Sequence, residues 1–211
     1  MAQLLNMFFL ALNGALAVPT VVYGTEIAAG ILVKRKPNRA IAVRRPSVAI
    51  VVPAHNEEDN IGGTIAALLP QLAEGDRVVV VADNCEDRTA AIARAAGVEV
   101  VERYDTQKRG KGYALDAGVA YVAKNPAECL IILDADCRLS DGAIDMLARQ
   151  VAETDKPAQA VYLMTAPKGA PIETQVAAFA YVIKCLARPL GLRRLGPVSY
   201  THLTLPTIYS V

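Results

Sequence analysis

The stretch LIILDADCRLS, residues 130–140, joins four apolar residues to two aspartates that are separated by one alanine. A short apolar run that ends in polar residues is typical of a buried strand that leads into a loop. Asp134 and Asp136 therefore stand where a strand leaves the core, with only the small Ala135 between them. Two acids in a turn can also do no more than cap the next helix. Similar polar clusters elsewhere in the chain favour a binding site over a simple cap.

Two other apolar runs end in polar clusters in the same way, SVAIVVPAHNEED at 47–59 and RVVVVADNCED at 77–87. We expect Asn60 and Ser140 to start helices and Gly97 to end one. Strands that alternate with helices predict an α/β fold with a mostly parallel sheet and helices on both faces. The expected helices are 60–73, 88–97, 110–124 and 140–153, and the further strands are 98–104, 129–136 and, less regular, 158–167.

The polar clusters that follow three of these strands should meet in space. They are residues 54–59, 83–87 and 134–136, and each of them holds at least two acidic residues. In open parallel sheets the carboxyl ends of the strands share one edge, and ligands bind there. Loops after strands are polar in any case, but acids at three strand ends favour a binding site.

The ligand class follows from what the chain has at those strand ends. The first strand is followed by PAHNEED, not by the G-x-G-x-x-G of a dinucleotide fold, and no G-x-x-x-x-G-K-[ST] loop occurs. A phosphate-bearing ligand would then need a divalent cation held by carboxylates, and Mg²⁺ or Mn²⁺ suits oxygen ligands. The pair Asp134 and Asp136 is the candidate. Lys111, within KRGKGY (108–113), is either a phosphate partner or a solvated surface lysine.

Composition excludes some classes of partner and places the chain in a reducing compartment. The formal net charge of the 211 residues is only +1, so no basic field indicates nucleic-acid binding. The four cysteines form no C-x-x-C pair and no metal-site spacing, and we expect them to be reduced in a cytosolic environment.

The N-terminal segment differs from the rest of the chain. From Leu4 to Val33 the only charged residue is Glu26, and about 20 apolar residues suffice to cross a bilayer as a helix. We therefore expect residues 1–33 to form a transmembrane helix and the basic residues 34–46 to form a juxtamembrane linker. The linker's charge predicts an inner-membrane protein whose domain after residue 46 lies in the cytoplasm. A cleaved signal peptide or a buried soluble helix is the alternative.

The C-terminal residues 198–211, VSYTHLTLPTIYSV, differ abruptly in composition from the segment before them. They resemble the translation of a sequencing adapter, and we expect a non-native tail that follows a partial domain at 47–197. A natural β-rich tail is the alternative. Residues 173–196 are expected to form an apolar helix with a basic end, either against a membrane surface or in a core.

The ordered motifs VVPAHNEED, VVVVADNCEDRT, KRGKGYALDAG and LIILDADCRLS resemble those of glycosyltransferase family 2, whose domain has the GT-A fold. The resemblance covers residues 47 to about 165. It implies that the loop after the first strand borders the nucleoside and that the acid ending the second strand, Asp83, contacts the base. The family often has a glycine in the second motif, which ADNCEDRT lacks. The nucleoside loop corresponds to Pro53, Ala54, Asn56 and Glu57.

The same resemblance implies the chemistry of the other residues. Lys111 would lie near the phosphates of a nucleotide sugar, and Asp134 and Asp136 would engage Mg²⁺ or Mn²⁺ and the diphosphate. The implied activity is an inverting transfer of a sugar from a nucleotide-diphosphate sugar, UDP-linked by expectation, to a polysaccharide or lipid acceptor. The catalytic base is expected beyond residue 197, so the chain by itself is expected to be inactive. A non-catalytic nucleotide-sugar-binding or membrane-scaffolding protein and a nucleotidyltransferase are the alternatives.

Overall fold

The computed structural model describes residues 1–32 and 42–196. Within these residues the chain forms two compact units. One unit holds the sheet and its helices, up to Val161, and the other holds the N-terminal helix together with the helices that follow Tyr162. Most of the predicted basic linker and the whole predicted tail, 198–211, lie outside the described residues.

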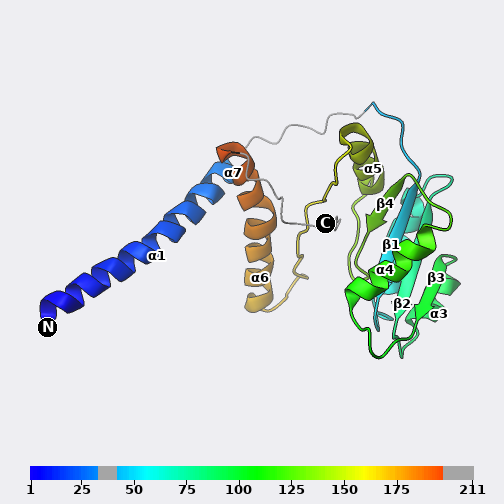
Figure 1. The fold of residues 1–211 in the computed structure, drawn as a ribbon, viewed down its shortest axis with the longest axis horizontal. Helices are drawn as coiled ribbons and strands as arrows, with labels where there is room; N and C mark the ends of the chain where they lie inside the picture. The colour runs from blue at the N-terminus through cyan, green and yellow to red at the C-terminus, as the bar shows by residue number, and fades with distance from the viewer. Residues whose placement is uncertain (33–41, 197–211) are drawn as a thin grey trace. The chain divides into compact units, whose positions relative to one another are not determined.

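The sheet has four parallel strands in the order β3-β2-β1-β4, which confirms the predicted fold class (Figure 1). Because β1 pairs with both β2 and β4, the strand order reverses beside it, and the carboxyl ends of all three strands face the same edge. Such a reversal is the usual place for a ligand in an open α/β sheet. The strands are β1 (Val48–Ala54), β2 (Arg77–Asp83), β3 (Glu99–Arg103) and β4 (Cys129–Ile132).

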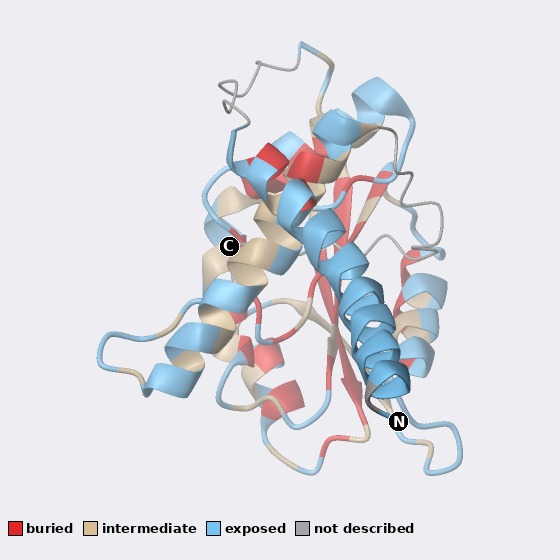
Figure 2. Ribbon diagram, turned by 90° about the vertical axis from the view of Figure 1, so that its left-hand side faces the viewer, coloured by how far each residue is buried: buried red, intermediate tan, exposed pale blue. Residues whose placement is uncertain are grey.

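Helix α4 (Lys111–Val122) covers one face of the sheet. Ala114 and Val122 on its inner side pack in one cluster with Val51 and Val79 of the central strands. Gly118 allows the close approach, because a Cβ atom there would lie 2.5 Å from Val51 Cγ1. Strands β1, β2 and β4 are almost wholly buried, as the red ribbons in Figure 2 show, whereas β3 at the edge of the sheet is only partly buried. Valine-rich runs of this kind are typical of parallel strands that are covered on both faces.

Helices α2 (Ile61–Leu68) and α3 (Thr89–Ala95) lie on the opposite face. Ala90 of α3 packs with Ala82 of β2, whose side chain points away from α4, and α3 in turn contacts α2. A short 3-10 turn, Leu69–Gln71, extends α2. Helix α5 (Ala143–Thr154) follows β4 and buries one apolar side. Helices on both faces therefore complete the predicted layers.

The start of β1 is held by a buried ion pair. Asp76, whose side chain is inaccessible to solvent, accepts two hydrogen bonds from Arg45, at 3.0 and 2.6 Å, and one from the backbone N–H of Val48 at 2.9 Å. Burial tends to raise the pKa of the Asp76 carboxyl, but the hydrogen bonds from Arg45 and from the N–H groups of Ala73 and Val48 hold this pKa below its usual value. The pair fixes the chain at the edge of the sheet opposite the strand ends.

Two local predictions are wrong. Residues 158–167 form no strand, because this segment leaves the sheet unit at Val161 and has no neighbouring strand with which to pair. Ser140 does not cap α5, since the helix begins at Ala143 after Gly142, whose φ of +75° suits glycine. Ser140 contributes only its carbonyl, which accepts a hydrogen bond from the Ala143 N–H at 3.1 Å.

The second unit begins with the long helix α1 (Ala2–Ile31), in which polar side chains find partners on the preceding turn. Asn13 donates to the carbonyl of Phe9 at 2.7 Å, and Thr20 donates to that of Leu16 at 2.8 Å. By length and composition alone, Gln3–Ile31 and Ile172–Leu195 are each apolar enough to cross a membrane. Figure 2 shows α1 exposed along most of its length.

Ile172–Leu195 is the expected apolar helix, interrupted by one wider turn. It runs as α6 (Ile172–Val182), a π-helical segment (Ile183–Ala187) and α7 (Arg188–Leu195). The π turn ends at Ala187, two residues before Pro189, which lacks an N–H and crowds the turn before it.

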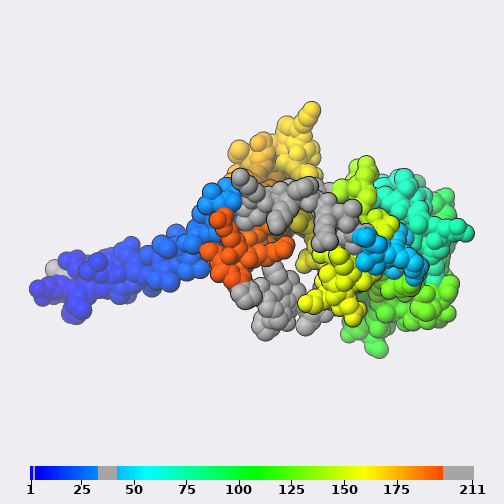
Figure 3. Space-filling view, turned by 90° about the horizontal axis from the view of Figure 1, so that it is seen from above, coloured from blue at the N-terminus to red at the C-terminus, as the bar shows by residue number. Residues whose placement is uncertain are grey.

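Helix α7 packs directly on the C-terminal end of α1, as the space-filling view shows (Figure 3). A Cβ atom on Gly30 would overlap the Ala187 carbonyl oxygen, and one on Gly191 would overlap the Glu26 carbonyl oxygen. The two backbones therefore touch, as small residues permit where helices cross. Arg188 Nε donates to the Glu26 carboxylate at 2.6 Å beside this contact.

Candidate functional site

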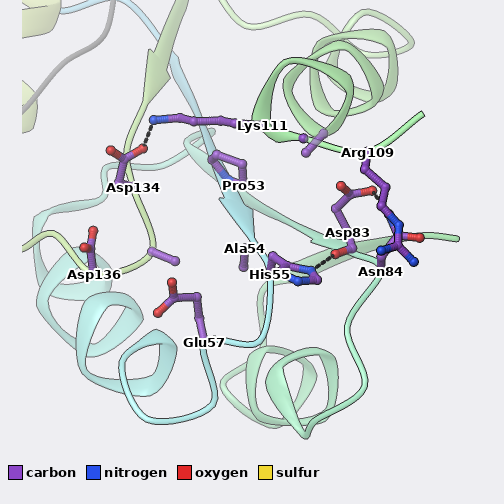
Figure 4. A pocket seen from close by; sticks show the side chains of 13 residues that line it. Pro53, Ala54, His55, Glu57, Asp83, Asn84, Arg109, Lys111, Asp134 and Asp136 are labelled. Atoms are coloured by element: carbon purple, nitrogen blue, oxygen red, sulfur yellow. Dashed lines mark hydrogen bonds and ion pairs between the residues drawn. The ribbon is translucent and has the colours of Figure 1, made fainter. Parts of the chain in front are cut away.

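A cavity of about 500 Å³ lies at the carboxyl ends of β1, β2 and β4, beside the first turn of α4 (Figure 4). Its walls come from four separate segments, as expected for a ligand site at the reversal of the strand order. Seven of the eight predicted site residues line it, and Asn56 does not. The lining residues are Pro53, Ala54, His55, Glu57, Asp83, Asn84, Arg109, Gly110, Lys111, Ala114, Asp134, Ala135 and Asp136.

Asp134 and Asp136 lie at the end of the cavity formed by the segment after β4. The backbone N–H of Leu133 still bonds to the Val51 carbonyl at 3.1 Å, so the pair begins where the sheet ends. Between the two aspartates the Ala135 carbonyl accepts a hydrogen bond of 2.6 Å from the buried hydroxyl of Thr64 on α2. This bond anchors the short segment that carries both carboxylates.

The donor set fits a hard divalent cation. One ligand atom from each of Asp134, Asp136 and Cys137 lies within 4.8 Å of the others. Burial, followed by the charge of Asp136, raises the pKa of the Cys137 thiol to about 12, so this sulfur stays protonated. The two carboxylates are the groups in this cluster that suit such an ion, since Mg²⁺ or Mn²⁺ commonly binds one or two carboxylates together with substrate phosphates.

Lys111, the first residue of α4, forms an ion pair with Asp134 Oδ1 (Figure 4). Its side chain is 45% exposed and that of Asp134 is 24% exposed, so both groups face the cavity and solvent. Gly110, with a φ of +117°, turns the chain into the helix just before it. The ammonium group thus stands beside the Asp134 carboxylate, at a cavity wall where a cation and a phosphate could both find partners.

Asp83 marks the other end of the cavity and is held by a salt bridge. Its side chain is only 7% exposed, and Oδ1 accepts hydrogen bonds from Arg103 Nη1 at 2.7 Å and from Asn84 Nδ2 at 3.1 Å. The Arg103 guanidinium also lies over the ring of Tyr113. The Asp83 backbone carbonyl bonds to His55 Nδ1 at 2.7 Å (Figure 4). The carboxylate is therefore fixed in orientation at the cavity wall.

The loops that follow β1 and β2 are bound to each other. Asn56 Oδ1 accepts the backbone N–H of Glu86 at 2.8 Å, and the N–H of Glu57 donates to Thr89 Oγ1 at 2.8 Å. Burial tends to raise the pKa of Asp87, but hydrogen bonds from Thr89 and from the N–H of Glu58 hold it below its usual value. Asn56 thus joins the two loops, and Glu57 is positioned to face the cavity.

Sequence reasoning missed several residues that shape the cavity. His55 lies inside the PAHNEED motif, and its position between two predicted site residues could have indicated that it lines the cavity. Arg103 ends β3, so its approach to Asp83 follows once the strand order is known. Thr64 had no signal, because a threonine within an apolar helix pattern does not indicate a partner in another segment.

The comparisons with known proteins agree with this geometry. The family model for glycosyl transferase family 2 matches residues 49–170, more than half of the chain. A 4,4'-diaponeurosporenoate glycosyltransferase of Staphylococcus aureus is 30% identical over 139 residues, which are 62% of this chain and 36% of that protein. The chain thus spans about a third of the length of the curated relatives that it matches.

Two solved structures share the fold. A mannosyltransferase from Pyrobaculum calidifontis, solved with GDP-Man and Mn²⁺, has a TM-score of 0.55 at 21% identity, over 76% of this chain and 47% of its own. Glucosyl-3-phosphoglycerate synthase from Mycobacterium tuberculosis, solved with UDP, has a TM-score of 0.50 at 21% identity, over 62% of this chain and 51% of its own. With the match over 49–170, these findings confirm the resemblance of the sequence motifs: the chain belongs to glycosyl transferase family 2.

Proposed function

We propose that this chain binds a nucleotide-diphosphate sugar for transfer of the sugar, with inversion, to a polysaccharide or lipid acceptor. The observation that carries the proposal is the convergence of three strand ends and Lys111 on one cavity, with an acid held at each end of it. The family supports the reaction class, and the S. aureus relative is named as a glycosyltransferase. A divalent metal, Mg²⁺ or Mn²⁺, is part of the proposal.

Each end of the cavity suits one part of the donor. Asp83 would accept a hydrogen bond from the base, and the loop Pro53 to Glu57 would border the nucleoside. Lys111 would bind the diphosphate, next to the metal ligands Asp134 and Asp136. A bound Mg²⁺ or Mn²⁺ would stabilise the negative charge that develops on the diphosphate as its bond to the sugar breaks. Asp83 and the loop after β1 are already held by hydrogen bonds, so little reorganisation of the nucleoside end is needed on binding.

The hydrogen bonds of Asp83 favour a uracil base. Oδ1 already accepts bonds from Arg103 and Asn84, and among the described residues Oδ2 has no hydrogen-bond partner. With Oδ2 as the one oxygen left to accept a hydrogen bond, Asp83 suits a base edge that has a single N–H donor between two carbonyl groups, as uracil has. Guanine presents two adjacent donors, which would call for both carboxylate oxygens. A UDP-sugar is therefore the proposed donor.

The proposed location is the inner membrane, with the cavity on the cytoplasmic side. Support comes from α1, whose apolar side chains are exposed over most of its length, and from the second candidate span, Ile172–Leu195. Burial of such helices in lipid would remove a large apolar surface from water. Residues 1–33 as the anchor, 34–46 as the linker and 47–197 as part of the catalytic domain remain our proposed division of the chain.

The first experiment measures UDP binding by calorimetry on the full chain in detergent, with and without Mn²⁺. We expect binding that requires Mn²⁺ and that exceeds the binding of GDP. Asp136→Asn should weaken UDP binding in Mn²⁺ at least tenfold, because one of two carboxylate ligands is lost. Asp141→Asn, an exposed acid outside the cavity, is the matched control and should bind as the wild type does.

Equal binding by Asp136→Asn and the wild type would refute the metal assignment. Preference for GDP would refute the uracil assignment alone, and failure to bind any nucleotide would refute the donor site.

A further inference from the structure

We propose that Lys111 is an exchangeable counter-cation: it neutralises Asp134 until a divalent metal displaces it, and it then moves to the donor diphosphate. This inference rests on the proposed function, since it concerns the same cavity. It assigns to one lysine two successive partners, and it makes metal binding and nucleotide binding depend on each other through that lysine.

The positions of the three charged groups carry the first step. Lys111 and the two aspartates come from different elements, α4 and the segment after β4, and the ion pair joins them across the cavity wall (Figure 4). Lys111 binds Asp134 Oδ1, and Asp134 is also one of the residues whose ligand atoms cluster within 4.8 Å. The ammonium group therefore occupies the same carboxylate that a metal at this cluster would use.

Electrostatics decides what happens when a metal arrives. A divalent ion bound to Asp134 and Asp136 repels an ammonium group at contact distance, and both cannot share the same carboxylate oxygen without a large cost. A lysine is a compact charge on a flexible four-carbon stem, so it can leave while its backbone stays in place. Its side chain is almost half exposed, so solvent reaches the ion pair with Asp134.

The second partner lies within reach of the same stem. Lys111 lines the cavity together with Arg109 and the aspartates, so a diphosphate bridging to the metal would lie beside the displaced ammonium group. The metal must break the ion pair to bind alone, but the lysine recovers a partner when the diphosphate binds with it. Each ligand then raises the affinity of the other, and this coupling is reciprocal by thermodynamic necessity.

Three possible roles for Lys111 predict different changes in metal affinity and nucleotide affinity when its charge is removed. A lysine that only binds phosphate leaves the affinity for metal alone unchanged when it is replaced. If the lysine has only a structural role, its replacement lowers both the affinity for metal and the affinity for nucleotide. An exchanging lysine gives opposite signs: the variant binds metal alone more tightly and binds nucleotide in saturating metal more weakly.

The experiment measures Mn²⁺ binding to the full, tag-free chain without nucleotide, from the electron paramagnetic resonance signal of free Mn²⁺. For Lys111→Met we expect Mn²⁺ affinity to rise about two- to fivefold, the size of a partly exposed ion pair. UDP affinity in saturating Mn²⁺ should fall by at least as much. Lys108→Met is the matched control, because Lys108 is exposed on the loop just before α4 and does not line the cavity. It should change either affinity by less than twofold.

The outcomes separate this inference from the function on which it rests. If the wild type binds UDP with Mn²⁺ but Lys111→Met binds Mn²⁺ alone no more tightly, the exchange is wrong and the donor site stands. If Lys108→Met tightens Mn²⁺ binding equally, the effect is one of general charge, and the exchange is again wrong. If the wild type binds neither UDP nor Mn²⁺, the proposed function fails and the exchange fails with it. Circular dichroism of each variant checks the fold.

Discussion

Gly118 is the point at which α4 touches the sheet most closely, and replacing it with alanine tests how α4 is held. The new Cβ atom would lie 2.5 Å from Val51 Cγ1 and 2.9 Å from Val81 Cγ2. Carbon atoms in contact prefer about 3.5–4.0 Å, so α4 or the two valines must move by roughly 1 Å. Both valines are fully buried, and their branched side chains have few other rotamers.

The expected cost follows from two opposing effects. Overpacking of a core costs about 1–3 kcal/mol, whereas alanine in place of glycine in a helix gains up to about 1 kcal/mol. We therefore expect Gly118→Ala to lower the free energy of unfolding of the sheet unit by about 1–2 kcal/mol. For a slope of about 2 kcal/mol per molar urea, the midpoint moves down by roughly 0.5–1 M.

The assay is urea denaturation followed by far-ultraviolet circular dichroism, with two companions. Gly112→Ala lies in the same helix with no atom within 4 Å of its Cβ, and it should keep or raise the midpoint. Val51→Ala should cost less in the Gly118→Ala background than in the wild type, because it removes the methyl group that overlaps. If Gly118→Ala is as stable as the wild type, or if the two substitutions simply add, the close contact of α4 with β1 is not as described.

Two further predictions concern buried polar contacts. Thr64→Val keeps the shape of the side chain but leaves the Ala135 carbonyl without its donor, so stability should fall by about 1–3 kcal/mol and Mn²⁺ binding should weaken; unchanged Mn²⁺ affinity would show that this bond does not position the aspartates. Because the folded-state pKa of Asp76 lies below its unfolded value of about 3.9, its contribution to stability is complete above that pH and is lost as pH falls through the folded pKa. Asp76→Asn should therefore cost about 3 kcal/mol at pH 7 by breaking the pair with Arg45, and its denaturation midpoint should fall less steeply below pH 4 than that of the wild type.

The fold of the sheet unit could be predicted because each strand is a short apolar run with a polar end. Residues 48–54 and 77–83 are two such runs, and each is followed by a helical pattern. The segment 158–167 carried a similar apolar composition and formed no strand, since a strand also needs a partner that local sequence does not reveal. The start of α5 was misplaced for a smaller reason: Gly142, with its positive φ, is the N-cap, and Ser140 lies two residues before it.

The candidate site was predictable to the extent that it lies at strand ends. Asp83, Asp134 and the PAHNEED loop follow directly from where the strands stop, because parallel strands end at one edge. The supporting contacts were not predictable in the same way. Thr64 and Arg103 reach the site from elements far away in sequence, and only the register of the sheet and the packing of α2 bring them there.

The contact between Gly30 of α1 and the backbone of the π turn, and that between Gly191 and Glu26, have a practical consequence for anyone who shortens this protein. Removing α1 alone would uncover a bare strip of backbone on α7 and take away the carboxylate to which Arg188 donates. Removing the helices after residue 171 alone would leave Glu26, otherwise mostly buried, facing solvent or lipid. A water-soluble fragment for crystallisation should therefore omit both helical segments together and retain residues 42–161, which carry every residue that lines the cavity.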